Sequence, residues 1–249
     1  MQTGASRKPP RFRRNSLSAA IIAIGAMALP PLIASAADII GREASDDSGF
    51  SGQSHTFTSA DSGADELIGF RSLLPYTGNL TNNTITVSNS TGSGVAGVET
   101  DSGNASGNRL IINSGAYGYA QAAISLSGNA TGNAVIINGG TFSEGVIGAG
   151  TNDGVASGNT VTILGGAISG IIAGGYIDVS DNTNLGGSGS AINNTVNIES
   201  NAADLSNADL YGALYAAAPS SGDIFTGNTL NCCGALKTDH KTGVMRVQN

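Results

Sequence analysis

A short pattern of alternating polar and apolar positions recurs six times along the chain. Each copy starts with an asparagine, and apolar residues follow two and four positions later. The copies start at Asn83, Asn108, Asn133, Asn159, Asn194 and Asn228, in steps of 25, 25, 26, 35 and 34 residues. The apolar positions are Ile85, Val87, Leu110, Ile112, Val135, Ile137, Val161, Ile163, Val196, Ile198 and Leu230. Residues two apart share one side of a strand, and β-branched side chains favour strands, so the pattern predicts strands with these residues in a core.

The spacing of the copies predicts how the strands are arranged. A fixed period of 20 to 50 residues is typical of a solenoid, in which each repeat buries its apolar face only against its neighbours. We therefore expect an all-β fold, a right-handed parallel β-helix of about six rungs. With strands ~4.8 Å apart, the core of the rod would be roughly 25–30 Å long.

The asparagine that starts each copy is predicted to be structural. In rungs stacked in register, the six side chains would lie above one another where turn meets strand, and their amides could hydrogen-bond along the stack. A buried amide without partners would cost about 1–3 kcal/mol. The alternative is that these asparagines bind a ligand.

A second, glycine-rich apolar piece follows each of five asparagines, after roughly 8–16 residues. These pieces cover residues 94–98, 116–120, 145–150, 170–176 and 210–215. We expect them to form a second strand on another face of the coil. The pairs Gly139-Gly140 and Gly165-Gly166 would supply corners that need positive φ. A phosphate-binding loop is disfavoured, because no glycine cluster precedes a Lys-Ser/Thr pair or a helical pattern.

The two ends of the chain differ from the repeats. Residues 1–36 combine a basic start, an apolar run over 17–33 and the small-residue site Ala34-Ser35-Ala36, which predicts a secretory signal peptide. The pair Arg13-Arg14 raises twin-arginine export as an alternative to general secretion. We expect an irregular N-terminal cap region over 37–80, β-helix repeats over 81–232 and a non-repetitive tail over 233–249. Within the cap region, residues 64–70 and Leu73-Leu74 could form the cap or a first rung.

Charge excludes one class of partner. Five of the 11 Lys and Arg residues precede residue 15, whereas all 18 acidic residues follow residue 36. Without residues 1–36, six cations face 18 acids, a net charge of −12. Nucleic-acid binding needs a basic surface, so no nucleic-acid partner is expected.

No residues match a catalytic, cofactor or metal site. The acids Asp46, Asp47, Asp61, Asp65 and Glu66 are interpreted as solvated loop side chains. The pair Cys232-Cys233 could be redox-active or bind a metal with Asp239 and His240, but the spacing matches no standard site. Calcium binding at 186–190 is disfavoured, because the aspartate of the calcium-binding repeat is missing. The longer steps predict protruding loops at 178–192 and 199–207, where a solenoid could carry recognition.

The repeats and the leader resemble a known family. Runs such as Gly158-Asn159-Thr160-Val161-Thr162-Ile163, together with 171–176 and 221–231, are similar to the passenger of bacterial type V autotransporter adhesins. The resemblance implies an exported protein at the cell surface, in the periplasm or outside the cell. It implies host or matrix surface molecules, or self-association, as partners. In such families an outer-membrane barrel follows the passenger, but no alternating apolar segments of ten residues follow Asn231, so attachment would need a barrel absent from this chain.

Two other functions compete with a non-catalytic adhesin-like passenger. Polysaccharide-acting enzymes also use parallel β-helices, but their chemistry needs clustered carboxylates near a cation. Arg109 is the one cation on the predicted body strands, and no acidic groove is predicted beside it. The other alternative is a structural spacer or a truncated remnant without binding activity.

Overall fold

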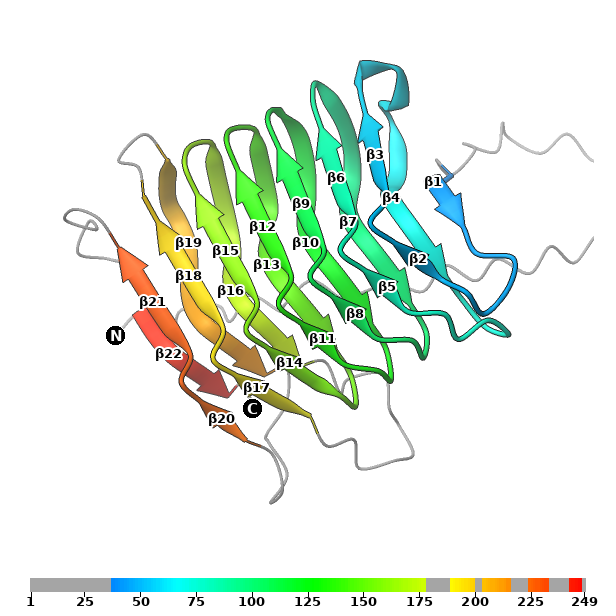
Figure 1. The fold of residues 1–249 in the computed structure, drawn as a ribbon. Coiled ribbons are helices and arrows are strands. Elements are labelled where there is room, and N and C mark those ends of the chain that lie inside the picture. The colour runs from blue at the N-terminus through cyan, green and yellow to red at the C-terminus, as the bar shows by residue number, and fades with distance from the viewer. Residues whose placement is uncertain (1–36, 178–188, 200–202, 216–223, 233–241, 248–249) are drawn as a thin grey trace, which may run out of the picture.

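The chain winds into three parallel sheets, so that each turn contributes one strand to each sheet (Figure 1). The computed structural model describes residues 37–177, 189–199, 203–215, 224–232 and 242–247, with the backbone alone for residue 232 and for 242–247. Over these residues the protein is an all-β solenoid, which confirms the predicted fold class.

The sheets are named here A, B and C. Sheet A holds β1 (Ile39–Glu43), β4 (Ala64–Ser72), β7 (Ser90–Thr100), β10 (Gly115–Ser125), β13 (Thr141–Thr151), β16 (Ala167–Ile177), β19 (Asp204–Tyr215) and β22 (Thr242–Val247). Sheet B holds β2 (Phe50–Ser51), β5 (Leu80–Thr81), β8 (Ala105–Ser106), β11 (Ala130–Thr131), β14 (Val155–Ser157), β17 (Ser190–Ile192) and β20 (Phe225–Thr226). Sheet C holds β3 (Ser54–Phe57), β6 (Thr84–Val87), β9 (Arg109–Ile112), β12 (Ala134–Ile137), β15 (Thr160–Ile163), β18 (Thr195–Ile198) and β21 (Thr229–Cys232). One 3₁₀ turn, η1 (Ser59–Asp61), follows β3.

The repeated apolar positions fill the core in register. In sheet C, Val135 pairs with Leu110 on one side and with Val161 on the other, so equivalent positions stack along the rod. The predicted core side chains from β6 to β18 are 0 % exposed, except Ile198 at 4 %. Leu230 is partly buried and packs against the same core cluster. Every rung therefore buries its apolar side against the rungs above and below it, as the period predicts.

Tight corners join the sheets. Before each ladder asparagine from Asn108 on, the backbone has positive φ, for example 65° at Gly107 and 55° at Asn193. Glycine adopts this conformation without strain, and asparagine tolerates it better than other residues. Between sheets C and A, Gly140 and Gly166 have φ values of 103° and 95°. The glycine pairs that the sequence places at corners therefore lie at corners.

The regular structure starts earlier than the sequence predicts. Residues 37–80 hold β1 to β5, which add strands to all three sheets, where an irregular cap was expected. In β3, His55 and Phe57 pair with Ile85 and Val87, and their rings pack edge to face with centroids 4.5 Å apart. Gln53 takes the place of the leading asparagine. This rung lacks both the asparagine and the aliphatic pair, so the sequence pattern does not reveal it.

The C-terminal part also differs from the prediction. In the expected non-repetitive tail, β22 pairs in parallel with β19 as the last strand of sheet A. Parts of the two expected loops are strands, because β17 starts at Ser190 and β19 at Asp204. The predicted signal peptide, the remaining loop residues 178–188 and 200–202, and Cys233, Asp239 and His240 lie outside the described residues.

Substituting adjacent inward and outward positions of one strand tests the alternation. Val161 is 0 % exposed, whereas Thr162 faces outward on β15. We expect Val161→Asp to lower the free energy of unfolding by at least about 4 kcal/mol, because it buries an unpaired carboxylate. Thr162→Asp should change it by less than about 1 kcal/mol. Urea unfolding measures both, and equal effects would contradict the assigned register.

Candidate functional site

The six asparagines that start the repeats form one buried column where sheet B meets sheet C. Five are 0 % exposed, and Asn228 at the end is 7 % exposed. Each Oδ1 from Asn108 to Asn228 accepts two hydrogen bonds from the preceding asparagine, one from its backbone N–H and one from its Nδ2, at 2.9–3.1 Å. At the N-terminal end, the N–H of Gln53 donates to Oδ1 of Asn83 at 3.0 Å. The column is therefore a continuous hydrogen-bonded ladder.

The ladder amides from Asn108 to Asn194 have no hydrogen-bonding capacity left for a ligand. The second hydrogen of each Nδ2 goes to a backbone carbonyl of the preceding rung at 2.7–3.1 Å. These carbonyls belong to Phe50, Leu80, Ala105, Ala130, Ala156 and Ala191. From Asn83 to Asn194, both hydrogens and the oxygen of each side-chain amide are thus used inside the protein. Their role is structural.

A second column of asparagines lies exposed at the corner before sheet B. Oδ1 of Asn79 accepts from the N–H of Asn104, and Oδ1 of Asn104 accepts from the N–H of Asn129, at 2.8 and 2.9 Å. Oδ1 of Asn129 then accepts from the N–H of Val155 at 2.9 Å. Sequence reasoning missed this column. Its signal is a second asparagine four residues before Asn83, Asn108 and Asn133.

One charged cluster lies on the outward side of sheet A. Arg71 in β4 donates from Nη2 to Asp38 at 3.0 Å and from Nε to Glu99 in β7 at 2.9 Å. The hydroxyl of Tyr119 in β10 donates to Oε1 of Glu66 in β4 at 2.6 Å. These residues are far apart in sequence, and the parallel register brings them together, since Arg71 pairs with Glu99 across β4 and β7.

Burial changes the protonation of this cluster. Burial raises the pKa of Glu66 to about 8. The hydrogen bond from Tyr119 lowers this pKa, whereas the charges of Glu99 and Asp38 raise it further. Burial also raises the pKa of Glu99, although the charge of Arg71 opposes it. The expectation that Glu66 is a solvated loop acid is therefore wrong, because it lies in a strand and is mostly buried. At neutral pH a largely protonated Glu66 lies beside an ion-paired Asp38–Arg71–Glu99 triad.

Further along this side of sheet A, most of the buried side chains are apolar. Ile147, Ile171, Ala173, Tyr176, Tyr211 and Leu214 form a cluster, each at most 7 % exposed, that is separate from the main core. Val146 and Ile172, next to them in sequence, belong to the main core instead. Side chains alternate along a strand, so β13 and β16 are buried on both sides. The sequence shows this as unbroken apolar runs rather than alternating ones.

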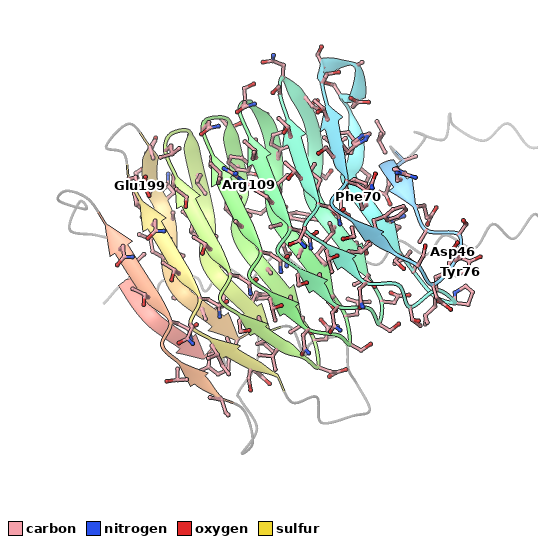
Figure 2. The ribbon with its side chains drawn as sticks, viewed as in Figure 1. Asp46, Phe70, Tyr76, Arg109 and Glu199 are labelled. Carbon is pink, nitrogen blue, oxygen red and sulfur yellow. The ribbon has the colours of Figure 1, made fainter. Side chains whose placement is uncertain are left out.

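The outward side of sheet C differs from that of sheet A, because its side chains are half-buried or exposed. From β6 to β21 its outward positions hold Thr84, Thr86, Arg109, Ile111, Ala134, Ile136, Thr160, Thr162, Thr195, Asn197, Thr229 and Asn231, all half-buried or exposed. Arg109 is exposed on β9 (Figure 2), and these positions include no Asp or Glu. No carboxylate from these outward positions therefore lies beside Arg109, the cation considered above as an enzyme residue.

The cysteine pair is only partly described. The backbone of Cys232 pairs with Ile198 at the end of β21. Within the described ranges, no three His, Cys, Asp or Glu side chains lie where they could hold a metal ion.

Comparisons with known proteins find no relative. No protein-family model matches the chain, and neither a curated protein nor a solved structure is significantly similar to it. No helix within the described residues is long and apolar enough to cross a membrane.

Removing one rung of the buried ladder should be costly. Asn133→Ala leaves three groups without partners: the backbone N–H of Asn108, one of the two Nδ2 hydrogens of Asn108, and the carbonyl of Ala105. At about 1–3 kcal/mol for each unpaired group, we expect a loss of at least about 3 kcal/mol in the free energy of unfolding. Asn138→Ala, at an exposed corner position, should cost less than about 1 kcal/mol. Chemical denaturation measures both, and similar losses would show that the ladder contributes no particular stability.

The raised pKa of Glu66 predicts how stability depends on pH. Between about pH 4.5 and 8 the folded protein retains a proton on Glu66 that the unfolded chain releases, so this residue lowers stability as pH rises. The Glu66→Gln variant has no titratable group at this position. From pH 5 to pH 8 its free energy of unfolding should therefore rise by on the order of 2–4 kcal/mol relative to that of the native chain. Melting temperatures across this range test it, with exposed Glu43→Gln as the control. If the melting temperatures of Glu66→Gln and of the native chain changed with pH in the same way, the raised pKa of Glu66 would be contradicted.

Proposed function

We propose that this chain is an exported, non-catalytic β-solenoid that binds other molecules through its outward faces and loops, like the passenger of a type V autotransporter adhesin. The proposal places it at the cell surface, in the periplasm or outside the cell. Its partners would be host or matrix surface molecules. The resemblance of the repeats and of the leader to this family supports the proposal.

One observation supports binding over catalysis most strongly. Stacked apolar side chains and a ladder of fully hydrogen-bonded side-chain amides fill the inside of the solenoid. Recognition therefore depends on outward side chains. Among the described residues, the charged cluster on the outward side of sheet A is an ion-paired triad beside a mostly buried, hydrogen-bonded Glu66. Structural ion-pair networks also shift pKa values, and we interpret this cluster as one of them.

Of the three outward sides, sheet C suits recognition best. Its strands are four residues long from β3 to β21, whereas most strands of sheet B have only two. Its outward residues are half-buried or exposed and change from rung to rung between threonine, arginine, alanine, isoleucine and asparagine. The outward apolar residues of sheet A are buried instead. A flat surface over a rigid parallel scaffold is suited to contacting an extended partner such as a matrix protein.

Binding assays with matched variants test the proposal. The purified chain is tested against cultured cells and immobilised extracellular-matrix proteins, and separately for release of reducing sugar from polysaccharides. We expect saturable binding, weakened at least about tenfold by the double change Arg109→Glu and Ile136→Asp. Ser157→Asp, on the outward side of sheet B, should leave binding unchanged. Sugar release without binding, or equal losses in both variants, would contradict the proposal.

A further inference from the structure

The exposed asparagine column carries a recurring tripeptide. Its three members start Asn79-Leu80-Thr81, Asn104-Ala105-Ser106 and Asn129-Ala130-Thr131. Asn-x-Ser/Thr, with x other than proline, is the acceptor sequence of N-linked glycosylation. The fourth equivalent rung reads Val155-Ala156-Ser157 and lacks the asparagine. The acceptor column therefore covers three consecutive rungs.

The fold holds the three tripeptides in the same conformation. Their middle residues, Leu80, Ala105 and Ala130, are 0 % exposed and anchor each tripeptide to the core. Parallel pairing of β5, β8 and β11 aligns the hydroxyl residues Thr81, Ser106 and Thr131. The asparagines themselves are exposed. Each tripeptide thus presents its asparagine and, two residues on, its half-buried hydroxyl on the outward side.

The hydrogen bonds of the column leave the reactive atom free. Each Oδ1 accepts from the backbone N–H of the next rung at 2.8–2.9 Å, which fixes the plane of the amide. Among the described residues, none accepts a hydrogen bond from Nδ2 of Asn79, Asn104 or Asn129. The ladder amides differ, because Nδ2 of Asn108, for example, donates to both Asn133 and Leu80. A substituent on Nδ2 would break the buried ladder but would leave every hydrogen bond of the exposed column intact.

We propose that Asn79, Asn104 and Asn129 are sites of N-linked glycosylation. The donor is a sugar activated as a glycosyl phosphate ester, and a separate transferase catalyses the step. A bond forms between Nδ2 and the anomeric carbon, while the bond from that carbon to the phosphate oxygen breaks. The phosphate leaves with the electron pair, and the displaced amide proton passes to a base of the transferase.

The spacing of the rungs limits the size of the saccharide. Neighbouring strands lie only about 4.8 Å apart, so glycans on consecutive rungs crowd one another. We therefore expect short saccharides on this column. This inference goes beyond the proposed binding function and does not depend on it.

The same tripeptide occurs in a different backbone setting elsewhere. Asn82, Asn89 and Asn193 also start an Asn-x-Ser/Thr sequence and are exposed, but their φ values are 54°, 58° and 55°. They turn corners in the left-handed conformation, whereas a strand extends directly from each column asparagine. They serve as an internal comparison, and we expect less modification there.

Peptide mass spectrometry of the full chain, purified from the cells that naturally produce it, tests the proposal. We expect peptides that contain Asn79, Asn104 and Asn129 to be heavier by one or more sugar residues. Ser106→Ala retains Asn104 and the buried Ala105, so it should fold normally yet lose the added mass at Asn104 alone. Asn104→Gln should lose it as well.

Three results would overturn the proposal. The first is unmodified mass for all three column peptides. The second is added mass at Asn104 that persists in a correctly folded Ser106→Ala variant, since the modification would then be independent of the acceptor tripeptide. The third is sugar confined to Asn82, Asn89 and Asn193. Circular dichroism and melting temperature confirm folding of each variant.

Discussion

The asparagine ladder is the interaction on which the rest of the structure depends. At the corner between sheets B and C the chain must turn sharply without leaving buried backbone groups unpaired. Each asparagine from Asn108 to Asn194 solves this by accepting two hydrogen bonds at Oδ1 and donating two from Nδ2, as Asn133 does with Asn108, Asn159 and Ala105. No rung can satisfy its own amide. The ladder is therefore complete only when rungs stack in register, which couples neighbouring rungs and favours one alignment.

Stacking in register constrains the inward positions of the chain, whereas the outward positions are free to vary. Inward columns repeat isoleucine, valine and leucine, because each must fill the same space between neighbouring rungs. Outward positions of sheet C range from Arg109 to Ala134 in adjacent rungs, because they do not have to fill the core. A surface that can change without disturbing the core suits a protein whose function depends on what it contacts.

Much of this fold follows from sequence pattern alone. Six of the seven strands of sheet C, the stacked asparagines and the second strand in sheet A all have a local signal, namely alternation, a leading asparagine or a glycine-rich apolar run. Sheet B does not, because a two-residue strand such as Ala105–Ser106 is too short to show a period. The first rung is hidden because Gln53 and His55 replace the asparagine and the first aliphatic residue.

The charged cluster and the apolar outer side of sheet A were harder to predict for a different reason. Arg71, Glu99 and Asp38 meet only once the register between turns is known, and turn lengths in this part of the chain differ from the 25-residue period. Glu66 looks like one of several loop acids until its strand and its partner Tyr119 are placed. Pairwise chemistry across rungs depends on tertiary register, which composition and local alternation do not encode.

Hydrogen exchange at the backbone amides of the ladder asparagines tests the central claim most directly. Each of these N–H groups from Asn83 to Asn194 donates to a side-chain oxygen inside a dry corner rather than to water. The stacked ladder predicts that they exchange as slowly as the core amides of sheet C, with protection decreasing toward the ends of the rod. Exchange as fast as at the exposed corner residue Ser102 would show that the ladder does not form.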